Sequence, residues 1–290
     1  MNALRRPFPV GPRGRLLLVF AVVGAISFSV LGLSLSGLLP AIGAAGQFGD
    51  FFGAALHPAV DYQAEWVPAG ASPFLQTVVR AMLETLLLAA AAMSLALWMA
   101  IPLALWTSES LWARQVRGAN GRESRHAAGR VILPVLRVFI AGMRSVHELL
   151  WAVVLLAAFG DHEFLAVLAI AIPFSGTLAK VFSEMLDEAP TDSTSALAEA
   201  GLSPILCFVF GRLPRALPDM TAYSFYRFEC AVRSSAVMGF FGFPTIGYYL
   251  KLSYENLHYR EVWTWLYALI ALVLVFEAWS ARLRSRWITR

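Results

Sequence analysis

The chain has 290 residues, of which 58% are hydrophobic and only 14% are charged. An average soluble domain carries far more charge, so this composition predicts a membrane protein. The net charge of +4 is dispersed over segment ends, which argues against a nucleic-acid-binding face, and the two cysteines and five histidines form no metal-ligand pattern.

The first membrane span is predicted over residues 16–39. Arginines precede it, and its apolar length is enough to cross about 30 Å of hydrocarbon, so we interpret it as a retained span rather than a cleaved signal peptide. Residues 40–73 contain no lysine or arginine, which predicts a location outside the cytoplasm. Their aromatic side chains fit a segment resting on the outer surface of the membrane, and an ordered lid over a pathway is the alternative.

Three further apolar segments follow along the chain. A second span is predicted over residues 74–106, and the arginine-rich loop after it indicates the cytoplasm. The third segment, residues 131–159, is interrupted at residues 144–148. We expect its first part to be an interfacial helix and its second part to cross the membrane. A fourth span is predicted over residues 164–182.

A polar stretch, residues 184–216, then interrupts the apolar pattern. Gly201 can adopt the left-handed conformation that ends a helix, and Pro204 suits the first turn of the next, so this stretch predicts a helix–turn–helix in the cytoplasm. A fifth span is predicted over residues 217–241 and a sixth over 262–281, after which arginines again indicate the cytoplasm.

The expected fold class is therefore an all-α polytopic membrane protein with about six transmembrane helices and both termini in the cytoplasm. We divide it into an N-terminal part, residues 1–73, with the tail, the first span and the outer loop, and a core of five spans, residues 74–290.

The sequence lacks the motifs of a self-sufficient enzyme. A phosphate-binding loop needs Gly-Lys, but the two lysines of the chain, Lys180 and Lys251, follow alanine and leucine. There is no Gly-x-Ser-x-Gly or Ser-x-x-Lys motif and no pair of catalytic acids at one depth. We therefore expect no catalytic residues, no metal site and no cofactor bound by this chain.

Charged residues inside the fifth predicted span are the main candidates for a pathway. Ionisable groups in a membrane helix usually face a bundle interior or a water-filled route. One interpretation is a structural ion pair between Glu229 and Arg233, with Arg227 packing against a neighbouring subunit. The other is a pathway for an anion, lined by Arg227 or Arg233 with Ser234 and Ser235.

A second polar group interrupts the third apolar segment. Arg144, His147 and Glu148 lie at the expected helix break near the cytoplasmic face. A kink with satisfied polar groups and a candidate gate are both open interpretations.

The polar stretch resembles the coupling motif of ATP-binding-cassette importer permeases, which is Glu-Ala-Ala, three residues, Gly, nine residues, Ile, any residue, Leu-Pro. Gly201, Leu213 and Pro214 match at the required spacing, whereas Ser195-Ala-Leu replaces Glu-Ala-Ala and Gly211 replaces Ile. Two further segments, Tyr226-Arg-Phe-Glu229 with Arg233 downstream and Arg144-Ser-Val-His-Glu-Leu-Leu-Trp-Ala152, resemble the phosphonate-importer branch. In the second segment, His147 stands where that branch has proline.

This resemblance implies a type I importer permease in the bacterial inner membrane, working as a pair of permeases with two ATPase subunits and a periplasmic substrate-binding protein. ATP and magnesium would bind to the ATPase, not to this chain. The implied ATPase-coupling residues are Ser195, Glu199, Ala200, Gly201, Leu213 and Pro214. The implied substrate is a phosphonate or a related phosphorus oxyanion such as phosphite or hypophosphite.

Two alternatives stay open at this point. The outer segment 242–247 is bulkier than the Gly-rich segment usual in that branch, so the substrate could be another small oxyanion. A secondary transporter or channel is the alternative of a different class, although the chain has no internal repeat of the kind common in such carriers. The sequence does not decide between two copies of this chain and a pairing with a second, similar permease.

Overall fold

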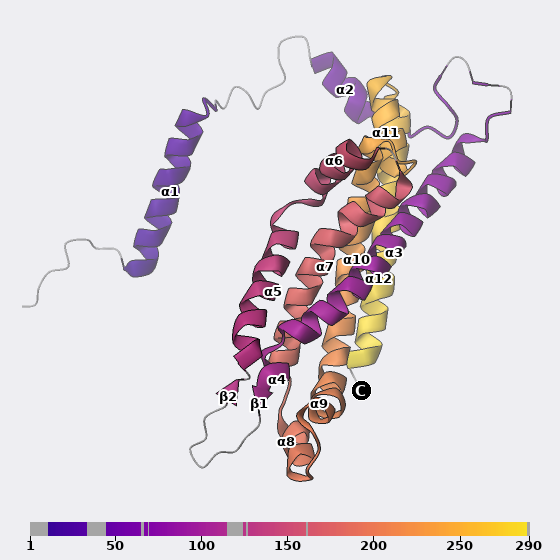
Figure 1. Ribbon diagram of the computed structural model, residues 1–290. Helices are drawn as coiled ribbons and strands as arrows, with labels where there is room; N and C mark the ends of the chain where they lie inside the picture. Colours follow the sequence, from indigo (N-terminus) through magenta and orange to yellow (C-terminus); the bar gives the residue numbers. More distant parts are fainter. Residues whose placement is uncertain are drawn as a thin grey trace, which may run out of the picture. The chain divides into compact units, whose positions relative to one another are not determined.

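A computed structural model describes residues 11–33, 45–64, 67–68, 70–114, 124–125, 127–160 and 162–288 (Figure 1). The chain divides into two compact units, Met1–Leu56 and His57–Arg290. The first unit contains α1 (Pro12–Val30) and α2 (Ala45–Ala54). Helix α1 is long and apolar enough to cross a membrane, as predicted for the first span, whose last residues, 34–39, lie outside the described part of the chain.

The second unit is a bundle of long helices. Its α-helices are α3 (Phe74–Thr107), α4 (Glu109–Trp112), α5 (Ala127–Ser145), α6 (Glu148–Phe159), α7 (Glu163–Glu188), α8 (Asp192–Glu199), α9 (Pro204–Cys207), α10 (Leu213–Met238), α11 (Ile246–Glu255) and α12 (Tyr259–Ile288). The other elements are the π-helix η2 (Phe208–Arg212), the 3-10 helix η3 (Gly239–Phe241) and the antiparallel two-residue strands β1 (Ala113–Arg114) and β2 (Ser124–Arg125).

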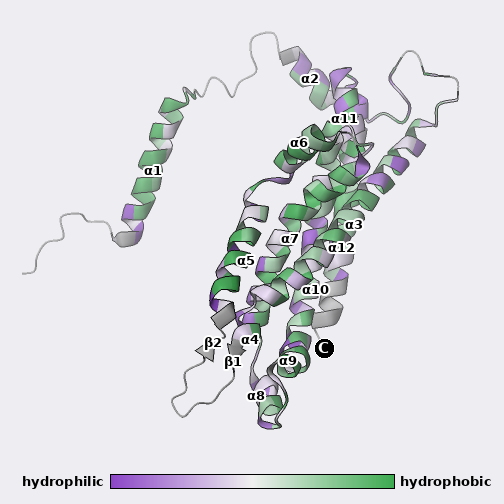
Figure 2. Ribbon diagram, viewed as in Figure 1, coloured by the Kyte–Doolittle hydropathy of each residue, from purple (hydrophilic) through white to green (hydrophobic). Residues whose placement is uncertain are grey.

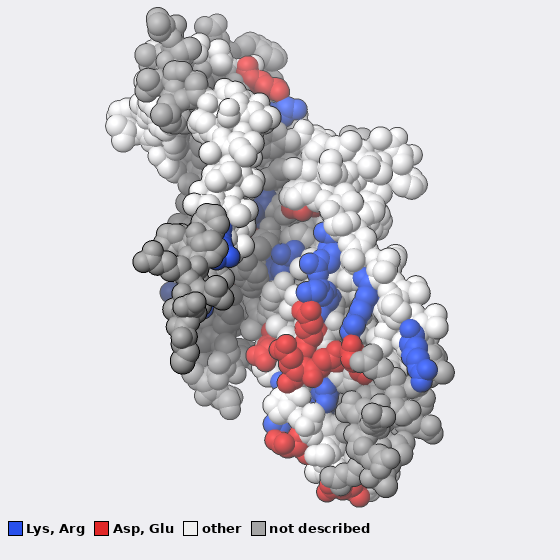
Figure 3. Space-filling model, turned by 90° about the vertical axis from the view of Figure 1, so that its left-hand side faces the viewer, with Lys and Arg blue, Asp and Glu red and all other residues white. Residues whose placement is uncertain are grey.

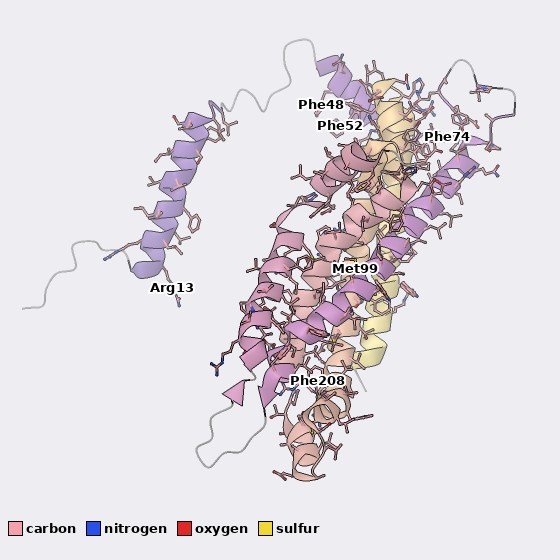
Figure 4. All side chains as sticks on the ribbon, in the orientation of Figure 1. Arg13, Phe48, Phe52, Phe74, Met99 and Phe208 are labelled. Atoms are coloured by element: carbon pink, nitrogen blue, oxygen red, sulfur yellow. The ribbon has the colours of Figure 1, made fainter. Side chains whose placement is uncertain are left out.

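Five limbs of this unit lie alongside one another, formed by α3, α5, α7, α10 and α12 (Figure 1). Helices α8 and α9 lie at one end of the bundle, which we call the hairpin end, and α6 and α11 lie at the opposite end, which we call the far end (Figure 1). Helix α12 runs from the far end back to the hairpin end. In Figure 4, Phe74 marks the far end of α3 and Phe208 lies beside the hairpin.

Four of the described helices are long and apolar enough to cross a membrane, namely α1, α3, α7 and α12, and the bent pair α5–α6 raises the number to five (Figure 2). Six spans were predicted. The difference is α10, the predicted fifth span, which does not qualify by composition because five charged side chains lie along it. Helix α10 nevertheless packs against α3, α7 and α12 within the bundle.

The third predicted segment differs from the expectation. The two halves, α5 and α6, meet at an angle of 88°. Helix α5 lies alongside α7, whereas the 12 residues of α6 rise only about 18 Å, too little to cross the hydrocarbon core alone. The expectation that the first half is interfacial and the second half crosses is therefore wrong. The long half that follows the bundle is α5, and the short, steeply turned half is α6.

Small side chains let the limbs pack closely. On α3, five alanines are fully buried, Ala89, Ala92, Ala96, Ala100 and Ala104. Where α5 meets α7, a Cβ atom added to Gly176 would lie 2.9 Å from the Met143 Cβ atom and 3.1 Å from the Ile140 carbonyl oxygen. Close approach of this kind is how membrane helices gain van der Waals contact when their surroundings are as apolar as they are.

Two glycines allow an equally close approach at the far end. A Cβ atom on Gly239 would lie 2.1 Å from the Tyr248 amide nitrogen, and one on Gly247 would lie 2.0 Å from the Ala236 carbonyl oxygen. The end of α10 therefore packs backbone to backbone against the start of α11. The Ile246 amide, which begins α11, donates to the buried Thr85 hydroxyl of α3 at 3.1 Å.

A polar clamp centred on Glu261 ties residues 57–64 to α11 and α12. The buried Glu261 carboxylate accepts from the Gln63 amide at 2.6 Å and from the Ser253 hydroxyl at 2.8 Å. The Gln63 side chain in turn accepts from the Glu261 amide at 3.0 Å, and Trp265 Nε1 donates to Ser253 Oγ at 3.2 Å. This end of the unit is thus held by a network in which one carboxylate joins three segments.

Candidate functional site

The first half of the predicted helix–turn–helix is α8, which ends as the sequence predicts. Gly201 has a φ of +85°, in the left-handed region. The Gly201 amide donates to the Ala198 carbonyl at 3.1 Å and the Leu202 amide to the Leu197 carbonyl at 3.2 Å, which is the bonding pattern of a Schellman motif. No other atom lies within 4 Å of a Cβ atom built on Gly201, so its backbone conformation, not crowding, requires glycine there.

The second half comprises α9, the π-helical η2 and the start of α10. Gly211, which stands where the coupling motif has isoleucine, faces α8: its added Cβ atom would lie 3.0 Å from the Thr194 Cα atom and 3.0 Å from its hydroxyl oxygen. The departure from the motif therefore has a structural reason, because the two limbs of the hairpin touch at this glycine. Pro214 occupies the first turn of α10, where proline needs no backbone donor.

The predicted coupling residues divide between the tip and the base of the hairpin. On α8 and its turn, Ser195, Glu199, Ala200 and Gly201 are exposed, and the Ser195 hydroxyl donates to the Asp192 carbonyl at 2.9 Å. At the base, Leu213 is half-buried and Pro214 is exposed. The hairpin thus presents a surface at its tip and joins α10 through its base.

The predicted pathway residues on α10 have different surroundings. The Arg227 guanidinium carbon lies 4.1 Å from the centre of the Phe174 ring of α7, and the Arg227 Nε atom is buried without a hydrogen-bond partner among the described residues. Glu229 and Ser235 are buried, Ser234 is half-buried and Arg233 is exposed.

The structure joins the candidate gate to the candidate pathway. The Ser234 hydroxyl of α10 donates to the Glu148 carboxylate of α6 at 2.8 Å. His147 caps α6 by accepting from the Leu149 amide at 3.3 Å, and its Nε2 atom lies 3.6 Å from Glu148. Arg144 occupies the exposed last turn of α5, just before the bend.

Cations dominate the ion pairing around this contact. We call Arg144, Arg227 and Arg233 the cation cluster. Within the described residues, none of the three forms an ion pair with a carboxylate. The predicted ion pair between Glu229 and Arg233 is therefore not formed. Unpaired arginines with one nearby carboxylate, Glu148, make a locally positive site suited to an anion.

Charge of both signs gathers on the face in Figure 3, with lysine and arginine across its middle and aspartate and glutamate below them. A pocket of 360 Å³ lies between α5, α7 and the end of α3, and its charged lining residues are Arg137, Arg144, Lys180, Glu184 and Asp187. Lys180 pairs with Glu184 at 3.0 Å and Arg137 with Glu109 at 3.1 Å. Below the cation cluster, therefore, cations are largely matched by acids. In the described part of the chain, no group of histidine, cysteine and acidic side chains fits a metal ion.

Sequence reasoning missed a polar network at the base of the hairpin, formed by Ser108, Ser110, Asp187 and Arg212, which we call the base network. Asp187, near the end of α7, accepts from the Ser108 hydroxyl at 2.7 Å and from the Ser110 amide at 3.0 Å. Arg212 donates to the Ser110 hydroxyl at 2.6 Å. These residues are up to about a hundred positions apart, so no local spacing reveals them.

Comparison with known proteins identifies the architecture. A family described as "Binding-protein-dependent transport system inner membrane component" matches residues 97–287, which is more than half of the chain. The permease of the MetNI methionine ABC transporter, in inward-facing conformations, superposes with a TM-score of 0.61 at 18% identity, covering 75% of this chain and 99% of that one. At this identity the likeness shows the fold alone.

Curated relatives match in sequence as well. The phosphite transport system permease protein PtxC of Stutzerimonas stutzeri is 32% identical over 160 residues, which is 54% of this chain and 57% of that protein. The putative cryptic phosphonate transport system permease protein PhnE2 of Escherichia coli K12 is 29% identical over 122 residues, covering 42% of this chain and 100% of that protein. The chain spans 53% to 64% of the length of three phosphite permease relatives that it matches.

Proposed function

The chain belongs to the family of binding-protein-dependent transport system inner membrane components, and on this premise we propose that it is the permease subunit of an ATP-driven importer for a phosphorus oxyanion. One observation carries the proposal: a helical hairpin with an exposed tip stands at one end of an apolar bundle. The sequence has no phosphate-binding loop, so ATP hydrolysis belongs to a separate ATPase subunit, for which the hairpin offers a contact surface.

In this proposal the chain crosses the membrane six times, with α1 as the first span and α10 as the fifth. Helix α10 fails a test of composition, but its buried neighbours on α3, α7 and α12 support a transmembrane position. Charges in a spanning helix are tolerated where they face protein or a water-filled route rather than lipid. The hairpin end is then cytoplasmic, and so is the C-terminus, because α12 runs to the same end (Figure 1).

Coupling runs through the hairpin. Its exposed residues Ser195, Glu199, Ala200 and Gly201 dock in a groove of the ATPase, and closure of the ATPase moves the hairpin as a lever. The base, Leu213-Pro214, passes this motion into α10. A working importer contains two permeases, two ATPase subunits and a periplasmic binding protein that delivers the substrate.

The substrate pathway passes the cation cluster and the hydroxyls of Ser234 and Ser235. Arginines lower the barrier for an anion, and Arg227, held over Phe174, keeps its charge free of any carboxylate in the described chain. Binding there is weak, because a transit site must also release its ion. At the bend, Arg144, His147 and Glu148 act as a gate, with the Ser234–Glu148 hydrogen bond joining α6 to α10.

The substrate class rests on two supports. The cation cluster fits a small oxyanion, and the printed names of the relatives include phosphite and phosphonate transport. We therefore propose a phosphonate, phosphite or hypophosphite as the substrate.

The docking role is tested by Gly201→Trp, with Gly201→Ala as the matched control. Both variants strain the left-handed backbone, but only tryptophan adds bulk to the tip. We expect Gly201→Trp to abolish co-purification with the ATPase, or to separate hydrolysis from uptake, while Gly201→Ala keeps most of both. Normal co-purification together with normal uptake in the tryptophan variant would contradict the docking role.

The pathway role is tested by Arg227→Gln, with Arg215→Gln as the control on the same helix. Loss of one positive charge should reduce uptake of labelled phosphite or phosphonate by roughly tenfold, which corresponds to about 1.4 kcal/mol of barrier. Arg227→Lys should restore part of the uptake because it restores the charge. Unchanged uptake in an assembled Arg227→Gln complex would rule out the anion pathway at this position. Uptake that follows an ion gradient without ATP would favour a secondary carrier instead.

A further inference from the structure

The base network closes the hairpin where it leaves and re-enters the bundle. The chain leaves at the end of α7, next to Asp187, and returns at Arg212, the last residue of η2. The Arg212 Nη1 atom donates to the Leu186 carbonyl at 3.2 Å and to the Asp187 carbonyl at 3.1 Å. The two ends of the hairpin are thus fastened to each other before α10 begins.

The same network fastens the hairpin to a third segment, α4, which follows α3. The Asp187 carboxylate accepts from the backbone amides of Glu109 and Ser110, both at 3.0 Å, so it caps the start of α4. The Ser110 hydroxyl donates to this carboxylate and accepts from Arg212 Nη1 at 2.6 Å. One serine therefore bridges the charge at each end of the hairpin, and its bonds involve ionised groups, which are the stronger kind.

This arrangement gives the hairpin a second mechanical route into the bundle. Through Leu213-Pro214 it reaches α10, and through Ser110 it reaches α4 and the end of α3. From α4 the route continues to α5, because Glu109 pairs with Arg137 at 3.1 Å. Helix α5 ends at Arg144, beside the bend. A displaced hairpin thus pulls on both limbs that meet at the Ser234–Glu148 contact.

We infer that Arg212 is a positioning residue for coupling: its bonds to Ser110 and to the end of α7 make the hairpin, α4 and α5 move together. This inference rests on the proposed function, since it needs the hairpin to be the ATPase contact. It adds that the leverage of the hairpin depends on α4 and α5 as well as on α10. The α10 route alone does not carry the whole stroke.

The geometry of Arg212 permits a sharp test. A single nitrogen, Nη1, makes all three bonds, to Ser110, Leu186 and Asp187. A lysine ammonium has three donors on one nitrogen and can replace them, whereas a glutamine amide has two donors and no charge. Arg212→Lys should therefore rescue what Arg212→Gln loses. Arg215→Gln is the control, because the Arg215 side chain is exposed and donates only to the Ser193 hydroxyl at 3.1 Å.

The experiment uses the full complex of permease, ATPase and binding protein in liposomes, with hydrolysis and uptake of labelled phosphite measured together. We expect Arg212→Gln to keep hydrolysis within about twofold and to lower the uptake per ATP by roughly tenfold, within the range of a typical coupling free energy. Arg212→Lys and Arg215→Gln should keep the wild-type ratio. Ser110→Ala, which leaves the two carbonyl bonds of Arg212 in place, should lower the ratio by a smaller factor and serves if Arg212→Gln does not assemble.

Each result has one meaning. A wild-type ratio in assembled Arg212→Gln, or in assembled Ser110→Ala if the glutamine variant is lost, overturns the inference. So does a parallel fall of hydrolysis and uptake with lowered thermal stability, which would give Arg212 a merely structural role. If the wild-type permease does not co-purify with an ATPase, the proposed function itself fails, and this result is visible before any variant is made.

Discussion

The clamp around Glu261 and the cation cluster are both polar groups within an apolar bundle, but their hydrogen bonding differs. At the clamp, each carboxylate oxygen of Glu261 accepts a hydrogen bond, and the Ser253 hydroxyl both donates and accepts. At the cluster, within the described residues, the Arg227 Nε and Ser235 Oγ atoms are buried without a hydrogen-bond partner.

This difference separates stability from function. A buried polar group that is fully bonded stabilises one arrangement of the chain, whereas an unbonded one costs free energy in the resting state. Groups of the second kind persist where they serve something other than folding. We therefore expect changes at the clamp end to affect folding first, and changes at the cluster to affect transport first.

The largest effect is expected for Gly247→Ala at the clamp end. A methyl group there would lie 2.0 Å from the Ala236 carbonyl oxygen, which is backbone and cannot turn aside. We expect a loss of stability of several kcal/mol, roughly 3 or more, and little folded protein in the membrane. Gly142→Ala is the control, because no other atom lies within 4 Å of its added Cβ atom. Accumulation and thermal unfolding in detergent measure both, and equal behaviour would mean that α10 and α11 can separate.

The next effect is expected for Glu261→Ala. Removal of the carboxylate leaves the Gln63 amide and the Ser253 hydroxyl without their acceptor, at a cost of about 2–3 kcal/mol. The melting temperature should fall clearly. Glu255→Ala, at an exposed glutamate whose nearest cation, Lys251, is 3.9 Å away, should change stability by less than about 0.5 kcal/mol. If both variants melt alike, the clamp does not hold this end together.

Local patterns in the sequence predict the local features of this structure. Gly201 and Pro204 predict the helix–turn–helix, because a left-handed glycine and a first-turn proline act on the backbone next to them. Long apolar runs likewise predict α3, α7 and α12. The charges of α10 weaken the same signal, so its position becomes clear only from the helices that pack against it.

Contacts between distant residues could not be predicted in this way. Ser234 and Glu148 are 86 positions apart and Arg212 and Ser110 are 102 apart, and no periodicity links them. The reverse error occurred for Glu229 and Arg233: a spacing of four favours an ion pair on an isolated helix, but the bundle buries one residue and exposes the other.

A smaller effect is expected for Ser234→Ala, which sharpens the comparison because Ser234 makes a bonded contact beside the cluster. Loss of its hydrogen bond to Glu148 should cost about 0.5–1.5 kcal/mol of stability. Uptake should change more than stability, since the contact joins the bend to α10. Ser234→Thr, which keeps the hydroxyl, should behave like the wild type. A variant that melts earlier but transports normally would place this contact with the clamp rather than with the pathway.

The smallest effect on stability is expected for Ser235→Ala, and it is the most direct test of the comparison. The Ser235 side chain is fully buried, and within the described residues its hydroxyl has no hydrogen-bond partner, so its removal takes away an unmet polar group. Stability should stay the same or rise slightly, by up to about 1 kcal/mol. Ser253→Ala in the clamp deletes the same atom but breaks two bonds, and should cost about 1–2 kcal/mol. If the Ser235 hydroxyl serves the passing oxyanion, uptake by Ser235→Ala falls although the protein melts no earlier. Unchanged uptake would remove Ser235 from the pathway, and a lowered melting temperature would show that its hydroxyl stabilises the fold.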